Sequence, residues 1–371
     1  MQEQLTAMSV EMYDARRQYL KGAKGWVPAS RAVFDASVLQ FAGGCQGSWF
    51  CPSDNCLYHS CMAKSYHFSF SVLLLILVAS APVLADVVRA ATIRVAPIYL
   101  SPDTSSAKLA DVDRGRELIF LETSGDWVKV EANLTEERIV TGWMQTKGLI
   151  QSKTPDGDKI LFGEAVDSED QASQRNGRRY AAQDAMRLYG EVAEIFPQSP
   201  LAAEGMYRSA DIRWQIEKVD VMSLPSAKEQ EAYLRKGMNE DYFKKVIKKF
   251  PGTKWAYLAA YQMIDNKLCG DWQGQSKCPQ KEAEIYENYA KQYSQSPAVA
   301  EALYRAAYRW SALIEIYKAE DQEKKSDEAR GHALADAQKA IAQAGTSDWG
   351  PRAQRLLYMV QQGIPTYGNG G

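Results

Sequence analysis

Apolar residues in the C-terminal half of the chain recur at helical spacing, and the pattern repeats when Phe196, Phe250 and Tyr293 are superimposed. Each copy has apolar residues three, four and seven positions before this anchor, then a short break, then a second apolar stripe. The spacing i, i+3, i+4, i+7 is typical of one buried face of a helix. The pattern therefore predicts repeated pairs of helices joined by tight turns, over residues 173–371.

Further aromatic residues hold equivalent places in the copies. They are Tyr189, Phe243 and Tyr286 before the anchor, and Tyr207, Tyr261 and Tyr304 after it. A single helical pair cannot bury its apolar face alone, so we expect the copies to stack into an all-α solenoid whose surface binds partners. A fourth, weaker copy around residues 348–351 fits a terminal capping repeat.

The anchors lie 54 and 43 residues apart, which is longer than the 34 residues of a tetratricopeptide repeat. We assign the excess length to two stretches. The first, Val219 to Ala227, precedes an expected long helix that runs to Phe250. The second, Asn266 to Gln280, is a glycine-containing loop.

The turn sequences, an aromatic residue followed by Pro or Ser and then by Ser or Thr, resemble those of tetratricopeptide-like repeats in bacterial envelope proteins. The nearest families are the outer-membrane-assembly lipoproteins and the coordinators of the Tol-Pal system. This resemblance implies envelope proteins as partners. Polar positions of the first helices are the candidate groove residues, namely Arg187, Glu191, Lys244 and Lys248.

Residues 90–150 alternate between apolar and polar positions in several short runs separated by turns, which predicts a small all-β barrel. The runs Trp127-Val128-Lys129-Val130 and Thr141-Gly142-Trp143-Met144 resemble the bacterial SH3-like domain. The resemblance implies docking to the cell wall, to peptidoglycan or to another envelope component, without catalysis. Its candidate ligand face is Trp127, Trp143 and Tyr99, and packing in the core or rim is the competing role of the two tryptophans.

Residues 62–85 have the layout of a secretory signal peptide, with an apolar core over residues 68–79 and small residues before a cleavage point after Ala85. Residues 1–61 are then a mis-assigned extension, and the mature protein is periplasmic or secreted. Contact with the membrane is in that case transient. The alternative is an uncleaved membrane anchor over residues 68–84.

Export leaves Cys269 and Cys278 as the cysteines of the mature chain, and a pair of cysteines in an oxidising compartment favours a disulfide. Two reduced thiols are the alternative if the chain stays in the cytosol. The polar stretch 151–172 is expected to link the two domains.

The sequence offers little chemistry. Of its three histidines only His332 follows the cleavage point, and no catalytic constellation, metal-binding spacing or cofactor motif is recognised. A net charge of −2 gives no basic surface for nucleic acid. The sequence thus favours a non-catalytic envelope adaptor. An accessory or regulatory subunit of a peptidoglycan-processing enzyme is the alternative, and a component of outer-membrane protein assembly is a weaker one.

Overall fold

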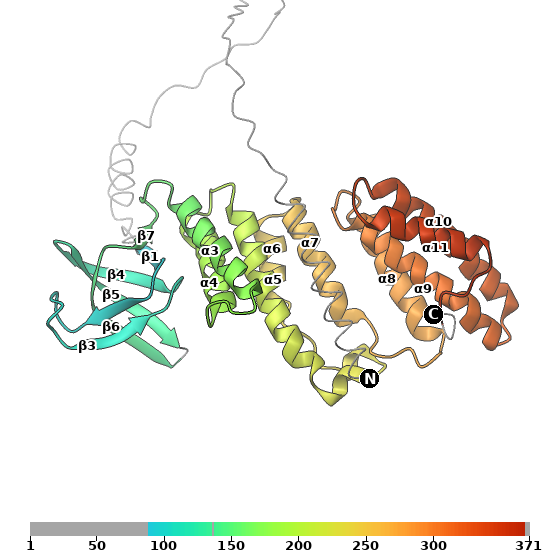
Figure 1. The fold of residues 1–371 in the computed structure, drawn as a ribbon, viewed down its shortest axis with the longest axis horizontal. Coiled ribbons are helices and arrows are strands. Elements are labelled where there is room, and N and C mark those ends of the chain that lie inside the picture. Colours follow the sequence, from blue (N-terminus) through green and yellow to red (C-terminus); the bar gives the residue numbers. More distant parts are fainter. Residues whose placement is uncertain (1–87, 136, 368–371) are drawn as a thin grey trace, which may run out of the picture. The chain divides into compact units, whose positions relative to one another are not determined.

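The computed structural model describes residues 88–135 and 137–367. Within them a seven-stranded sheet is followed by nine α-helices (Figure 1). The expectations for residues 1–61, for the signal peptide over 62–85 and for an anchor over 68–84 lie outside the described residues. No helix in the described part of the chain has both the length and the apolar character of a membrane span.

The strands are β1 (Arg89–Thr92), β2 (Ala96–Tyr99), β3 (Lys108–Val112), β4 (Glu117–Ser124), β5 (Trp127–Thr135), β6 (Arg138–Gln145) and β7 (Leu149–Gln151). Their order in the sheet is β3-β2-β6-β5-β4-β1-β7, and every pair is antiparallel. Burial alternates along β5, where Val128, Val130 and Ala132 point into a core that also contains Leu118 and Met144. This alternation is the period-two signal that the sequence carries.

The expectation of a closed barrel is wrong, because the edge strands β3 and β7 do not pair with each other. The side of the sheet next to β7 packs against helices instead. Ala91 of β1 and Ile150 of β7 share a core with Leu161, Ala185 and Leu188, which lie on the first two helices. Helix packing therefore covers the outer face of β1 and β7, opposite the side chains of Ala90 and Leu149 in the sheet core.

The helices are α3 (Gly157–Ser173), α4 (Ala181–Ile195), α5 (Ala202–Met222), α6 (Asp241–Lys249), α7 (Lys254–Gln262), α8 (Lys277–Gln292), α9 (Val299–Ala319), α10 (Glu323–Gln343) and α11 (Trp349–Gln361). Short 3-10 helices are η1 (Pro225–Lys228), η2 (Ala232–Leu234) and η3 (Met263–Lys267). The expected helical pairs are present as α4 with α5, α6 with α7, and α8 with α9.

The three anchors occupy the same structural position. Phe196, Phe250 and Tyr293 are the C-cap residues of α4, α6 and α8, with φ of −123°, −127° and −118°. The N–H of each donates to the carbonyl four residues earlier. The aromatic side chain thus marks the point at which the first helix of a pair ends, which explains why superposition on it aligns the copies.

Tyrosine rings fill the space between the second and third pairs. The ring of Tyr261 on α7 lies 6.2 Å from that of Tyr286 and 5.1 Å from that of Tyr289, both on α8. The Tyr289 hydroxyl donates to the Tyr257 carbonyl at 2.9 Å. Stacking of successive pairs therefore depends on the aromatic positions that the sequence repeats.

Two segments differ from the sequence-based expectation. Residues 157–172 of the expected linker lie in α3, which packs along α4. The expected long helix up to Phe250 is wrong, because α5 continues to Met222 and the chain then forms η1 and η2 before α6 begins at Asp241. Pro225 accounts for the end of α5, since proline disfavours the helical conformation of the residue before it, and Leu224 is extended.

The last pair, α10 with α11, corresponds to the weaker fourth copy. Ala353 and Leu357 are buried as the superposition requires, whereas Tyr358 is 57% exposed. An exposed outer residue is what a terminal repeat presents.

Candidate binding surfaces

The three aromatic residues of the predicted ligand face lie together on the sheet. Tyr99 of β2 is directly opposite Trp143 of β6, and Trp143 is opposite Lys129 of β5. Residues that face one another across strands point to the same side. Trp127 precedes Lys129 by two positions and shares that side, and its ring meets the Tyr99 ring edge-to-face at 5.7 Å. We call Tyr99, Trp127 and Trp143 the aromatic face.

The aromatic face is on the opposite side of the sheet from the core. Val128 and Met144, the neighbours of Trp127 and Trp143, are fully buried, whereas all three aromatic residues are only half-buried. None of the three belongs to the hydrophobic core of the sheet. Alternation along β2 places Ile98 in the core while Tyr99, on the other side, pairs with Trp143. A half-exposed row of aromatic rings can stack on a ligand.

The candidate groove residues on α4 are occupied by contacts with the sheet region. Arg187 Nε donates to the Arg114 carbonyl at 2.8 Å, and its guanidinium pairs with Asp184 at 2.5 Å. Glu191 lies near Arg89 and Glu117, which pair with each other across β1 and β4. Both residues therefore lie at the junction between the sheet and the helices.

The candidate groove residues on α6 are at the surface. The Lys244 ammonium pairs with Glu240 at 3.1 Å, and its side chain is 60% exposed. Lys248 is also exposed. The neighbouring lysines make the contact to α4, where Lys245 pairs with Glu194 at 2.7 Å. The structure thus does not gather the four predicted groove residues into one site.

A groove does occur between the first helices of the third and fourth copies, with a volume of about 340 Å³. Its lining includes Glu284 and Glu287 of α8, Trp310 and Tyr317 of α9, and Glu328 and His332 of α10. The Trp310 indole Nε1 donates to Glu287 Oε1 at 2.6 Å, and its ring stacks on His332 at 4.4 Å. We call this the α8–α10 groove.

The sequence contained a signal for the α8–α10 groove. In the superposition, Glu284 holds the position of Arg187, and Glu287 holds the position of Lys244. The predicted groove residues Arg187 and Lys244 are therefore at the right positions within the repeat, but in the first and second copies and not in the third. The acidic character of these two positions in the third copy, together with His332 and Trp310 nearby, is the feature that sequence reasoning left unused.

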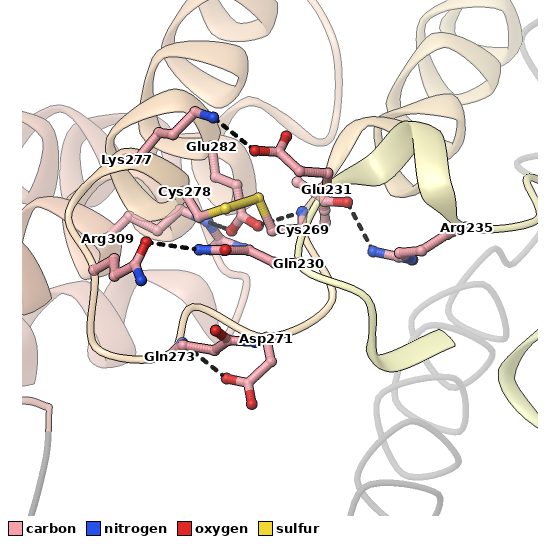
Figure 2. The surroundings of a disulfide bond; sticks show 12 residues. Gln230, Glu231, Arg235, Cys269, Asp271, Gln273, Lys277, Cys278, Glu282 and Arg309 are labelled. Carbon is pink, nitrogen blue, oxygen red and sulfur yellow. Dashed lines mark hydrogen bonds and ion pairs between the residues drawn. A yellow bond between two sulfur atoms is a disulfide. The ribbon is translucent and has the colours of Figure 1, made fainter. Parts of the chain in front are cut away.

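The predicted disulfide between Cys269 and Cys278 is present (Figure 2). It closes the loop that precedes α8, and Cys278 itself is buried at the start of that helix. Glu282 lies beneath the loop, where its Oε1 accepts the Cys269 N–H at 2.7 Å and its Oε2 accepts Arg309 Nε at 2.7 Å. One carboxylate therefore ties the disulfide loop to both α8 and α9.

The disulfide loop also contacts the segment between α5 and α6. We call residues 223–240 and 268–276 the two insertions. The Gly270 N–H donates to the Glu229 carbonyl at 3.1 Å, and Arg235 donates to the Leu268 carbonyl at 2.7 Å. Beside the loop, the Lys277 ammonium pairs with Glu231 at 2.6 Å (Figure 2). The loop before α8, which the sequence showed as excess length, and the segment before α6, which the sequence placed in a long helix, thus form one hydrogen-bonded unit.

Glu191 makes the junction sensitive to pH. Burial raises the pKa of its carboxyl to about 8, and the charges of Glu117 and Glu194 add to this, against the effect of Arg89 and Lys245. Its Oε2 has no hydrogen-bond partner among the described residues. A raised pKa means that the folded state holds the proton more tightly than the unfolded state does. Protonation of Glu191 therefore contributes to the free energy of unfolding, and this contribution is fully present below pH 4.5 and is lost as the pH rises to about 8.

We therefore expect Glu191→Gln to stabilise the protein at pH 9, by on the order of 2 kcal/mol, because glutamine carries no charge into the junction. At pH 4.5 the same variant should differ little from the parent. Urea unfolding at the two pH values measures both effects. The exposed Glu229 supplies the control, and Glu229→Gln should leave the pH dependence of unfolding unchanged. A Glu191→Gln profile parallel to that of the parent would contradict the assignment.

Among residues 88–135 and 137–367, no group of three or more His, Cys, Asp or Glu side chains is placed to hold a metal ion. His332 is 54% exposed and lies beside Glu287. The two cysteines in the described part of the chain, Cys269 and Cys278, are joined to each other, so neither is a free thiol beside His332.

No known protein family matches the chain, and no curated protein matches it. Among solved structures, the chain is similar to one described as the DHF58 filament, at 16% identity and a TM-score of 0.20. The match covers 55% of this chain and 91% of the other. A similarity this low supports no argument about fold or function.

Proposed function

We propose that this protein is a non-catalytic adaptor of the bacterial cell envelope. In this proposal the sheet region is an open SH3-like module that docks to the cell wall or to a partner through the aromatic face. The helical pairs form a tetratricopeptide-like array that holds another envelope protein. The protein acts outside the cytoplasm, in the periplasm or after secretion.

The aromatic face is the observation on which the proposal depends. Tyr99, Trp127 and Trp143 occupy one side of the sheet, and their rings remain partly accessible although apolar side chains favour burial. Lys129 lies beside Trp143 on the same side and adds a hydrogen-bond donor. Accessible rings with polar neighbours are the composition of a binding surface for a sugar or a peptide.

The disulfide supports the proposed location. Cys269–Cys278 is consistent with an oxidising compartment, because cytosolic proteins rarely retain structural disulfides. The proposal of a periplasmic or secreted protein also agrees with the signal-peptide pattern over residues 62–85.

Retention on purified cell-wall sacculi tests the proposal. The parent protein should sediment with sacculi and release no muropeptides, whereas Trp143→Ala should bind about thirtyfold more weakly, because loss of a central aromatic contact costs about 2 kcal/mol. Leu100→Ala is the matched control, since Leu100 follows Tyr99 directly and is 65% exposed outside the aromatic face. This control should bind as the parent does.

Each contrary outcome has a distinct meaning. Release of muropeptides by the purified protein would show catalysis. Equal retention of Trp143→Ala and the parent would remove the aromatic face from the binding site. If sacculi retain neither protein, the wall is not the ligand, and capture of envelope proteins by the parent but not by Trp143→Ala would identify a partner protein at this face.

A further inference from the structure

The α8–α10 groove has an aromatic floor and acidic walls. Trp310 and Tyr317 of α9 form the floor and are only 7% and 3% exposed. Glu284 and Glu287 stand on the α8 wall, and Glu328 stands on the α10 wall. Three carboxylates around two buried rings create a negative potential over the negative faces of those rings. A cation is the ligand that this combination favours.

The groove already accommodates one ammonium group. Lys325 of α10 lines it, and its Nζ lies 5.5 Å from the centre of the Tyr317 ring. The Tyr317 hydroxyl donates to Gln280 Oε1 at 2.8 Å, which holds the ring in place. An ammonium on a flexible methylene chain therefore fits this space, although Lys325 itself is exposed and free to move aside.

A buried carboxylate, that of Asp336, contacts Glu287 of the groove lining. Asp336 is only 2% exposed, and its Oδ1 accepts the Lys339 ammonium at 2.9 Å. Its Oδ2 has no hydrogen-bond partner among the described residues. Burial raises the pKa of the neighbouring Glu287, and the Asp336 carboxyl adds to that effect. Two carboxyl groups in contact need a proton or a cation between them.

We propose that the α8–α10 groove binds a lysine side chain from a partner protein. The ammonium lies at the carboxylates of Glu284 and Glu287, and the methylene chain displaces Lys325 from the Tyr317 ring. This inference rests on the proposed function, in which the helical pairs hold another protein, and it names the chemistry that one groove recognises.

Peptide titration monitored by NMR tests the inference. The protein is labelled with ¹⁵N, and the Trp310 indole signal is assigned from the Trp310→Phe variant. The probe is acetyl-Ala-Ala-Lys-Ala-Ala-amide, and the comparison peptides carry norleucine or arginine in place of lysine. The lysine peptide should shift the Trp310 indole signal. The norleucine peptide, which has the same chain without the charge, should not.

Two variants with opposite expected effects make the test specific. Glu284→Gln with Glu287→Gln should weaken lysine-peptide binding about tenfold, because the charged acceptors are removed. Lys325→Gln should strengthen it about threefold by removing the competing ammonium, a gain that a folding defect cannot imitate. Asp241→Asn, at the repeat position of Glu284 in the second copy, is the control and should leave binding unchanged.

Binding of the norleucine peptide with equal affinity would overturn the inference, as would unaltered binding in the double glutamine variant. A preference for the arginine peptide would also overturn it, because the ligand would then be a guanidinium. A protein that ignores all three peptides but is still retained by sacculi through the aromatic face refutes this inference alone. The proposed adaptor function then remains.

Discussion

Replacing Glu282 by alanine should destabilise the protein by about 3–5 kcal/mol, the usual effect of removing one partner from a buried ion pair. Glu282 is 2% exposed and Arg309 is 9% exposed. Without the carboxylate, the Arg309 guanidinium stays buried with no counter-charge, and the Cys269 N–H loses its acceptor. The midpoint of urea unfolding measures the loss.

Two further variants separate the causes. Glu315→Ala removes an ion pair of α9 with Lys318, whose side chains are 33% and 41% exposed, and it should cost less than about 1 kcal/mol. Glu282→Gln keeps an oxygen that can accept the Cys269 N–H but removes the charge, so its effect should lie between those of the two alanine variants. Similar decreases in the free energy of unfolding for Glu282→Ala and Glu315→Ala would show that the buried pair contributes no more than an exposed one.

A methyl group added at Gly115 should separate the sheet from the helices. Gly115 adopts φ of +67°, and a Cβ atom there would lie 2.6 Å from the backbone nitrogen of Leu188 on α4. Backbone atoms of a packed helix cannot move aside cheaply. Gly115→Ala should therefore destabilise the protein by about 3 kcal/mol or more, the sum of left-handed backbone strain and a steric clash.

Gly125→Ala is the matched control. Gly125 also has a left-handed backbone, with φ of +57°, but nothing lies within 4 Å of the added Cβ. Its change to alanine should cost only about 1 kcal/mol, from backbone strain alone. Urea unfolding gives both values, and limited proteolysis near residues 151–156 reports on the junction directly. Equal decreases in the free energy of unfolding for Gly115→Ala and Gly125→Ala would mean that the close contact of Gly115 with α4 does not affect stability.

The repeat was readable from sequence because its determinants are local. Each aromatic anchor ends a helix through its own backbone conformation, and the apolar stripe on either side records the face that is buried. Closure of the sheet was not readable, because it depends on whether β3 and β7 meet. Local alternation also does not report that Ala91 and Ile150 pack on α3 and α4.

The binding surfaces were predictable to different extents. Alternation along β5 and β6 placed Trp127 and Trp143 on one side of the sheet, so their grouping followed from strand geometry. The location of the α8–α10 groove could not be predicted in this way, because it depends on which copy keeps its polar positions clear of contacts with the rest of the fold. Arg187 donates a hydrogen bond to the carbonyl of Arg114, which lies 73 residues earlier in the chain. No pattern within a repeat predicts that contact.

The union of the two insertions has an evolutionary consequence. In the 268–276 loop the Gly270 N–H donates to the Glu229 carbonyl, and the Leu268 carbonyl accepts from Arg235 of the 223–240 segment. Deleting either one would strip the other of its acceptors and donors. Descendants of a common ancestor should therefore gain or lose these stretches together, and a homologue with a shortened second copy should also lack the cysteine pair.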